Sequence, residues 1–177
     1  MFKKNIILKG KHAEYMKKLH SILNVSNGIK LFNRNLDVYI FAPIIGIVYG
    51  RTALVDNELK DDTSIHTEQL QGELDVLTYN YRLIMLLAQK DTLSLEERMD
   101  RAFRYDKDEG KRKAGDELFE QYVLGGIEVL YEKIMEESKE MDQYLQNIFK
   151  FISEYNERYN SMIENDKIYD LCRLASD

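Results

Sequence analysis

Asp37 and the segment Glu58-Leu59-Lys60 have the residue types of a magnesium-dependent nuclease, in which an upstream aspartate and a Glu-x-Lys motif surround the metal ion. That chemistry requires the motif on a buried strand, where its carboxylate can hold the ion in a dry site. Here acidic residues flank the motif on both sides and indicate a solvated loop. We therefore rank a nuclease below the binding functions that follow.

Other catalytic and metal-binding patterns are missing from the sequence. His12, His20 and His66 are its three histidines, and no acid or cysteine completes a ligand set around them. Cys172 has no histidine close to it in the sequence to activate it as a nucleophile. The phosphate-binding motifs Gly-x-x-x-x-Gly-Lys and Gly-x-Gly-x-x-Gly do not occur. We predict a protein that is not an enzyme and binds no metal or cofactor.

Basic side chains form two groups that could bind nucleic acid. The net charge of the chain is −6, yet residues 1–36 contain eight basic residues and one acid, and a ridge of arginines three residues apart follows Ser94. The candidate nucleic-acid residues are Lys3, Lys4, Lys9, Lys11, Lys17, Lys18, Arg98, Arg101 and Arg104. Acidic residues lie close to the arginine ridge, so a solvated face with local ion pairs is its favoured interpretation. The rest of the chain is acidic, so the basic end is expected to lie against it.

The C-terminal third has the clearest pattern in the sequence. Large side chains follow one another from Met141 at alternating steps of four and three, which is the heptad period of a coiled coil. The stripe must be covered by the rest of the chain or by a partner protein. The predicted partner-interface residues are Leu145, Ile148, Ile152, Tyr155, Tyr159 and Met162.

Helical spacing of apolar residues predicts further helices over 12–24 and 67–90, and a capping box predicts another that begins after Ser94. The apolar segment 36–49 favours a buried helix kinked at Pro43, with two short strands as the alternative. We expect a loop over 51–66 and a charged link over 106–115. Near residues 136–140 the regular spacing of the apolar residues is interrupted, which predicts either a stutter or a hinge between two helices.

The predicted fold class is all-α, a single helical domain with a long C-terminal helix or helical hairpin that carries the heptad seam. Residues 1–135 would form a helical core with a basic N-terminal segment, and residues 136–177 would form an extension that packs on the core or on a partner. A chain of 177 residues, 44% hydrophobic and 32% charged, is neither disordered nor a membrane protein. One cysteine and the lack of a targeting segment indicate the cytoplasm.

Three stretches, taken together, resemble the DNA phosphorothioation-associated protein 4 family of bacterial anti-phage islands. They are the apolar segment that ends in Gly50-Arg51, the helix Tyr81-Arg-Leu-Ile-Met-Leu-Leu-Ala88, and the segment from Glu117 to Leu130 with its Gly-Gly-Ile-Glu core. The resemblance covers roughly residues 30–135. The chain is also similar to the small middle component that accompanies SMC-like ATPases and an effector nuclease in Lamassu-type antiviral defence.

These resemblances imply an accessory subunit without a catalytic centre. Its partner would be a larger protein, an SMC-like ATPase, a nuclease or both, with DNA contacted indirectly through the complex; a homo-oligomer is a further option. If this role applies here, the candidate structural and packing residues are Gly50, Arg51, Gly125 and Gly126. Two glycines inside a helix cost about 1 kcal/mol each relative to alanine, a cost that close backbone packing would offset. Direct DNA binding through the basic residues is the alternative function.

Overall fold

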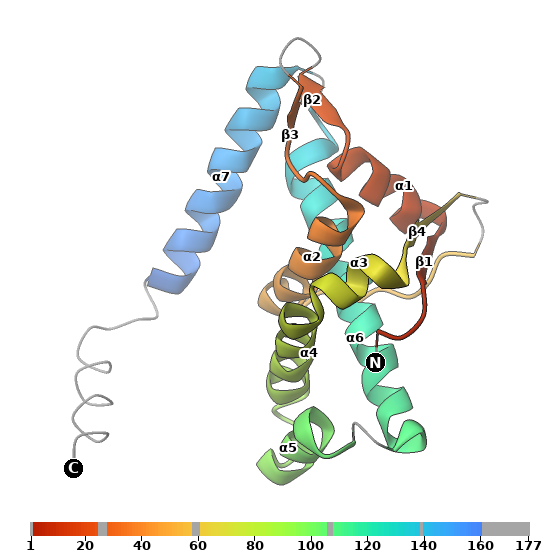
Figure 1. The fold of residues 1–177 in the computed structure, drawn as a ribbon. Helices are drawn as coiled ribbons and strands as arrows, with labels where there is room; N and C mark the ends of the chain where they lie inside the picture. The colour runs from red at the N-terminus through yellow and green to blue at the C-terminus, as the bar shows by residue number, and fades with distance from the viewer. Residues whose placement is uncertain (1, 25–27, 58–60, 106–107, 139, 161–177) are drawn as a thin grey trace.

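The computed structural model describes residues 2–24, 28–57, 61–105, 108–138 and 140–160, and within these ranges the chain is mostly helical (Figure 1). In chain order the elements are β1 (Ile6–Lys9), α1 (Gly10–Leu19), β2 (Ile22–Asn24), β3 (Ile29–Lys30), α2 (Asn35–Tyr49), β4 (Asp62–Ile65), α3 (Thr67–Gly72), α4 (Leu74–Leu87), α5 (Leu95–Phe103), α6 (Glu109–Leu130), the π-helical turn η2 (Tyr131–Met135) and α7 (Met141–Asn160). Among these helices we find none that combines the length and the apolar character needed to cross a membrane.

The core is built around α2 and α6, which lie side by side through the middle of the molecule (Figure 1). The apolar segment is a helix rather than two strands, and it ends at Gly50, whose φ of 62° is left-handed. Leu36, Val38 and Ala42 of α2 are fully buried, as are Val123 and Ile127 of α6. Burial of such side chains supplies most of the stability of a domain of this size.

Glycines allow α2 and α6 to approach until their backbones touch. A Cβ atom on Gly126 would collide with the carbonyl oxygen of Ala42, and one on Gly46 would collide with the carbonyl oxygen of Tyr122. A Cβ atom on Gly125 would meet the carbonyl group of Arg51 in the same way. The two helices therefore use glycine for contact, which offsets the low helix propensity of that residue.

The all-α prediction is wrong in one respect, because two small antiparallel sheets are present. Strand β1 pairs with β4, with Ile6 opposite Ile65, and β2 pairs with β3. Strand β4 lies inside the segment predicted as a loop, and β2 lies in the last residues of the predicted helix 12–24. Both strands are short and depend on a partner strand elsewhere in the chain, so local periodicity does not reveal them.

The charged link predicted over 106–115 is also partly wrong, since α6 begins at Glu109. Asp108 caps the helix by accepting a hydrogen bond from the backbone N–H of Lys111 at 3.1 Å. The capping box after Ser94 is confirmed, with the Ser94 hydroxyl and the Glu97 carboxylate each bound to the other residue's backbone N–H.

The chain turns between η2 and α7, so the predicted hinge is correct and the stutter is not. Helix α6 continues into η2, regular helix stops after Met135, and α7 starts at Met141. Figure 1 shows α7 running back beside the body at an angle that separates its far end from α2 and α6. The rest of the predicted extension, residues 161–177, lies outside the described residues.

Candidate partner interface

Helix α7 is fixed to the body by one face. The ring of Phe151 is buried and stacks on Tyr49 of α2, with centroids 6.0 Å apart and planes 12° from parallel. Lys133 of η2 forms an ion pair of 2.7 Å with Glu154, and the Asn147 amide donates to the Ser138 hydroxyl at 2.9 Å. These contacts set the rotation of α7 about its own axis.

A second apolar face of α7 is open to solvent. Leu145 is 51% exposed, Phe149 74% and Ile152 58%. With 3.6 residues per turn these three side chains fall within about 60° of one another around the helix. A contiguous apolar face of this kind is typical of a protein-binding surface.

The predicted heptad seam lies at the border between the packed face and the open face. Ile148 is partly buried against the body, whereas Leu145, Ile152 and Tyr155 are exposed. The side chain of Tyr159 and all of Met162 lie outside the described residues. Phe149 is not among the predicted interface residues, although its position four residues after Leu145 could have indicated it.

The predicted arginine ridge instead holds α5 against the end of α4. Arg98 donates to the carbonyl oxygen of Leu86 at 2.6 Å, and Arg101 donates to the Gln89 side chain at 2.9 Å. Arg104 is paired with Asp100 on its own helix. The carbonyl of Leu86 lies in the last turn of α4, where helices leave carbonyl groups without partners and favour cations.

This use of the arginines reverses the orientation expected for α5. The stripe formed by Leu95, Met99 and Phe103 points outward and is exposed, while Ala102 is buried against the body. The arginines were expected on a solvated face, because charged side chains are usually exposed. The unpaired carbonyl groups at the end of α4, which no sequence pattern displays, provide the reason for the reversal.

Several lysines of the basic N-terminal segment are paired with acids of the chain itself. Lys17 lies 3.0 Å from Asp61, and Lys18 lies 2.7 Å from Glu14. Within the described residues Lys3, Lys4 and Lys9 form no ion pair. The positive charge of this segment is therefore partly neutralised by the rest of the protein.

A buried polar cluster joins α1 to α6. The His12 ring, fully buried, has its Nε2 atom 3.0 Å from an oxygen of Glu128, and Lys11 lies 2.8 Å from the same oxygen. Arg51 approaches the other oxygen of Glu128 at 3.5 Å and pairs with Glu132 at 3.1 Å. Because more than a hundred residues separate His12 from Glu128, no local pattern could have predicted this cluster.

Protonation in this cluster follows from burial and hydrogen bonding. Burial lowers the pKa of His12 and outweighs the opposing effect of Glu128. Burial alone would raise the pKa of Glu128, but hydrogen bonds from Lys11 and His12 lower it below the ordinary value. A neutral His12 that donates from Nε2 leaves Nδ1 as a buried acceptor, for which the described residues provide no donor.

Of the three residues considered for a nuclease, the structure describes Asp37. Asp37 belongs to the first turn of α2, where its carboxylate accepts hydrogen bonds from the backbone and the guanidinium group of Arg34. Glu58 and Lys60 lie outside the described residues. Across the part of the chain that the structure describes, no three His, Cys, Asp or Glu side chains are grouped as metal ligands.

Comparison with protein families gives one match. Residues 9–170 match the family of DNA sulphur modification system-associated protein 4, so the match extends beyond the stretches that carried the resemblance in the sequence. No curated protein and no solved structure matches the chain significantly. Since the match spans nearly the whole chain, this protein belongs to the DNA sulphur modification system-associated protein 4 family.

Proposed function

We propose that the protein is a non-catalytic accessory subunit of a prokaryotic anti-phage defence complex, and that it binds a larger protein of that system through helical surfaces. Membership in a family associated with DNA sulphur modification supports a role in such a system. An adaptor needs a folded core and an apolar surface for its partner, and it needs no reaction centre of its own.

The open face of α7 is the observation that carries this proposal. Leu145, Phe149 and Ile152 are exposed on a helix whose other face is already fixed to the body. Covering each of these side chains would contribute about 1.5–3 kcal/mol to an interface. Because α7 is anchored before binding, little conformational entropy is lost when a partner docks.

The partner surface that best fits this face is another amphipathic helix. Large side chains along α7 repeat with the heptad period, and that period suits packing against a helix of a coiled coil. An SMC-like ATPase offers such helices in its coiled-coil arms, and an effector nuclease bound to it is the second candidate partner. DNA would then be contacted through the complex.

Co-expression with the neighbouring genes of the system, followed by mass measurement of the purified assembly, tests the proposal. We expect the chain to co-purify with one larger subunit at a fixed ratio. A chain that stays a monomer and never co-purifies with any of these proteins would contradict the proposal. A species containing only two copies of the chain would place a second copy, rather than a larger subunit, on the α7 face.

Direct DNA binding through the basic residues has less support. Arg98 and Arg101 are engaged at the end of α4, and the lysines of α1 have acidic partners. A DNA-binding surface would lose affinity steeply with salt, by a power law set by the number of phosphate contacts. A mobility shift at two salt concentrations measures this, and we expect weak binding with a shallow dependence.

A further inference from the structure

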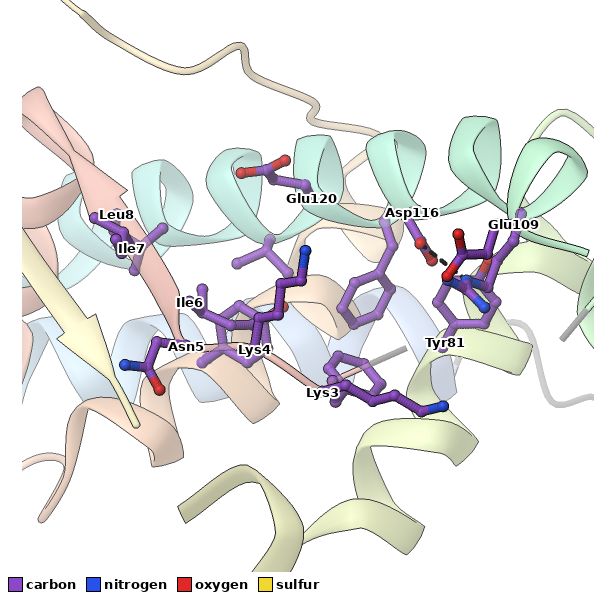
Figure 2. Close-up of a pocket in the computed structure, with 15 residues that line it drawn as sticks. Lys3, Lys4, Asn5, Ile6, Ile7, Leu8, Tyr81, Glu109, Asp116 and Glu120 are labelled. Carbon is purple, nitrogen blue, oxygen red and sulfur yellow. Dashed lines mark hydrogen bonds and ion pairs between the residues drawn. The ribbon is translucent and has the colours of Figure 1, made fainter. Parts of the chain in front are cut away.

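A cavity of about 530 Å³ lies between residues 2–8 and α6 (Figure 2). Its inner wall belongs to the core, since Phe119 of α6, Tyr81 of α4 and Tyr39 of α2 are each at most 5% exposed, and both tyrosine rings pack against Phe119. The lysine side chains that Figure 2 shows beside it are on the exposed surface. Core side chains and exposed lysines do not make a binding site, whereas the open face of α7 has apolar side chains that need cover.

The segment that follows α7 contains an apolar pattern of its own. Helix α7 reaches Asn160, and residues 161–177 come directly after it, outside the described residues. In their sequence the spacing i, i+3, i+4, i+7 occurs, which places four apolar side chains on one face of a helix. The four are Ile168, Leu171, Cys172 and Ala175. This pattern predicts a second amphipathic helix after α7.

The heptad stripe of α7 does not continue through this segment. If the alternating steps of four and three ran on beyond Met162, the stripe would include Asp166 and Arg173, which are charged. Asn165 and Asp166 are also residue types that favour turns and helix N-termini. The sequence therefore predicts a break after α7, with residues 161–165 as a connection short enough to join two antiparallel helices in a hairpin.

A second helix that folds back in this way is long enough to reach part of the open face. At 1.5 Å per residue, residues 166–176 would span about 16 Å, and the same distance along α7 runs from Asn160 back to about Phe149. Such a helix would cover Ile152 and Phe149. It would leave Leu145, which lies a further turn away along α7.

We propose that residues 166–176 form a helix that folds back on α7 and covers Phe149 and Ile152 while the larger subunit is absent. This inference rests on the proposed function, because the segment and the subunit compete for one face. A short connection gives the segment a high effective concentration at this face, on the order of millimolar, and a second copy of the chain lacks that advantage. The larger subunit must displace the segment, so its apparent affinity is reduced to the fraction of molecules whose face is open.

Cys172 provides a probe of this cover, because it is the single cysteine of the chain and belongs to the apolar face of the segment. A maleimide should alkylate it at least tenfold faster in Phe149→Gln/Ile152→Gln than in the wild type, since the thiol becomes accessible. Both substituted side chains are exposed on α7, so this variant should fold, and circular dichroism checks that it does. Leu145→Gln changes a side chain beyond the reach of the segment, and it should leave the rate unchanged.

Two results of the alkylation experiment would overturn the proposal. Equal rates in the wild type and in Phe149→Gln/Ile152→Gln would show that the segment does not cover these side chains. Protection of the thiol that increases with protein concentration would show that a second copy of the chain provides the cover.

The affinity for the larger subunit provides a second readout. Ile168→Gln/Leu171→Gln removes two apolar side chains from the covering face and should tighten subunit binding at least fivefold, because more molecules have an open α7 face. The matched control is Tyr169→Gln/Leu174→Gln, whose two large side chains fall about 110° from the centre of that face. This control should leave the affinity within about twofold. Unchanged or weaker binding by Ile168→Gln/Leu171→Gln would overturn the proposal.

The two readouts separate failure of the cover from failure of the proposed function. If no variant binds a larger subunit, but the Cys172 thiol is protected in the wild type and released in Phe149→Gln/Ile152→Gln, the cover is supported and the proposed function is contradicted. If the larger subunit binds to α7 and the thiol is equally reactive in all variants, the proposed function is supported and the cover is overturned.

Discussion

At the scale of residues, the carboxylate of Glu128 joins three basic side chains from other parts of the chain. One carboxylate accepts from Lys11 and from the buried His12, and it also lies near Arg51. Charges that are taken out of water require partners with good geometry, and removal of one partner leaves the others uncompensated. This cluster therefore ties α1 and the end of α2 to α6.

Replacement of Glu128 by glutamine should destabilise the protein by about 2–3 kcal/mol, because an amide cannot compensate the charge of Lys11. Urea unfolding followed by circular dichroism measures the change. The matched variant Glu132→Gln alters an exposed carboxylate that pairs with Arg51, and it should cost less than about 1 kcal/mol. Equal effects of the two substitutions would show that the buried cluster adds nothing to stability.

Stability should also depend on pH through His12 and Glu128. The pKa of His12 in the folded protein is below its ordinary value of 6.5, so the unfolded chain binds more protons just below that pH. The free energy of unfolding should thus be greatest above pH 6.5 and decline as the pH falls from there. A second decline should follow below about pH 4.5, the ordinary value for Glu128, whose folded pKa is lower.

The variant His12→Gln cannot take up a proton, and it isolates the first of these two declines. Its unfolding free energy should change less between pH 7 and pH 5 than that of the wild type. Parallel curves for the two proteins in this interval would show that His12 does not contribute to the pH dependence.

At the scale of elements, helix α5 illustrates what a sequence can and cannot predict: its start could be predicted, and its rotation about its own axis could not. The start of the helix depends on Ser94 and Glu97, three residues apart, so the local pattern was sufficient. The rotation of the helix depends on the end of α4, which Arg98 and Arg101 reach. That requirement is tertiary, and a reading of α5 alone assigned its exposed face wrongly.

Substitution of Arg98 by alanine should cost about 1–2 kcal/mol, because the carbonyl group of Leu86 loses its donor. Arg104→Ala removes only an exposed ion pair within α5 and should change stability by less than about 0.5 kcal/mol. Thermal unfolding of the two variants provides the comparison. A larger loss in Arg104→Ala would contradict the orientation of α5 described above.

The close contact between α2 and α6 predicts a larger loss of stability than the substitution of Arg98. In Gly126→Ala the added methyl group meets the backbone of Ala42, which cannot move without separating the helices, so stability should fall by about 3 kcal/mol. Gly72→Ala is the control, since nothing lies within 4 Å of the position of its Cβ atom. That variant should be neutral or slightly stabilising, and a similar loss in both would contradict close helix contact at Gly126.

At the scale of the whole molecule, the sequence predicted a mostly helical protein and its family, and it failed where distant segments meet. The helix around Pro43 follows from the apolar composition of its segment. The break before Met141 follows from a shift in the helical spacing of the apolar residues. The pairing of β1 with β4 and the contact of His12 with Glu128 join residues far apart in the chain. The cavity beside Phe119 likewise depends on side chains from four segments, so no single stretch indicates it.

The central claim is that the open face of α7 binds a larger protein, and the dissociation constant between the chain and its co-purified subunit tests it most directly. Replacement of Phe149 and Ile152 together by glutamine should weaken binding at least a hundredfold, because two apolar contacts are lost. The same double change at Leu95 and Phe103 of α5, also exposed, should leave the affinity within about threefold. An unchanged affinity in the α7 variant, or a loss confined to the α5 variant, would contradict the account.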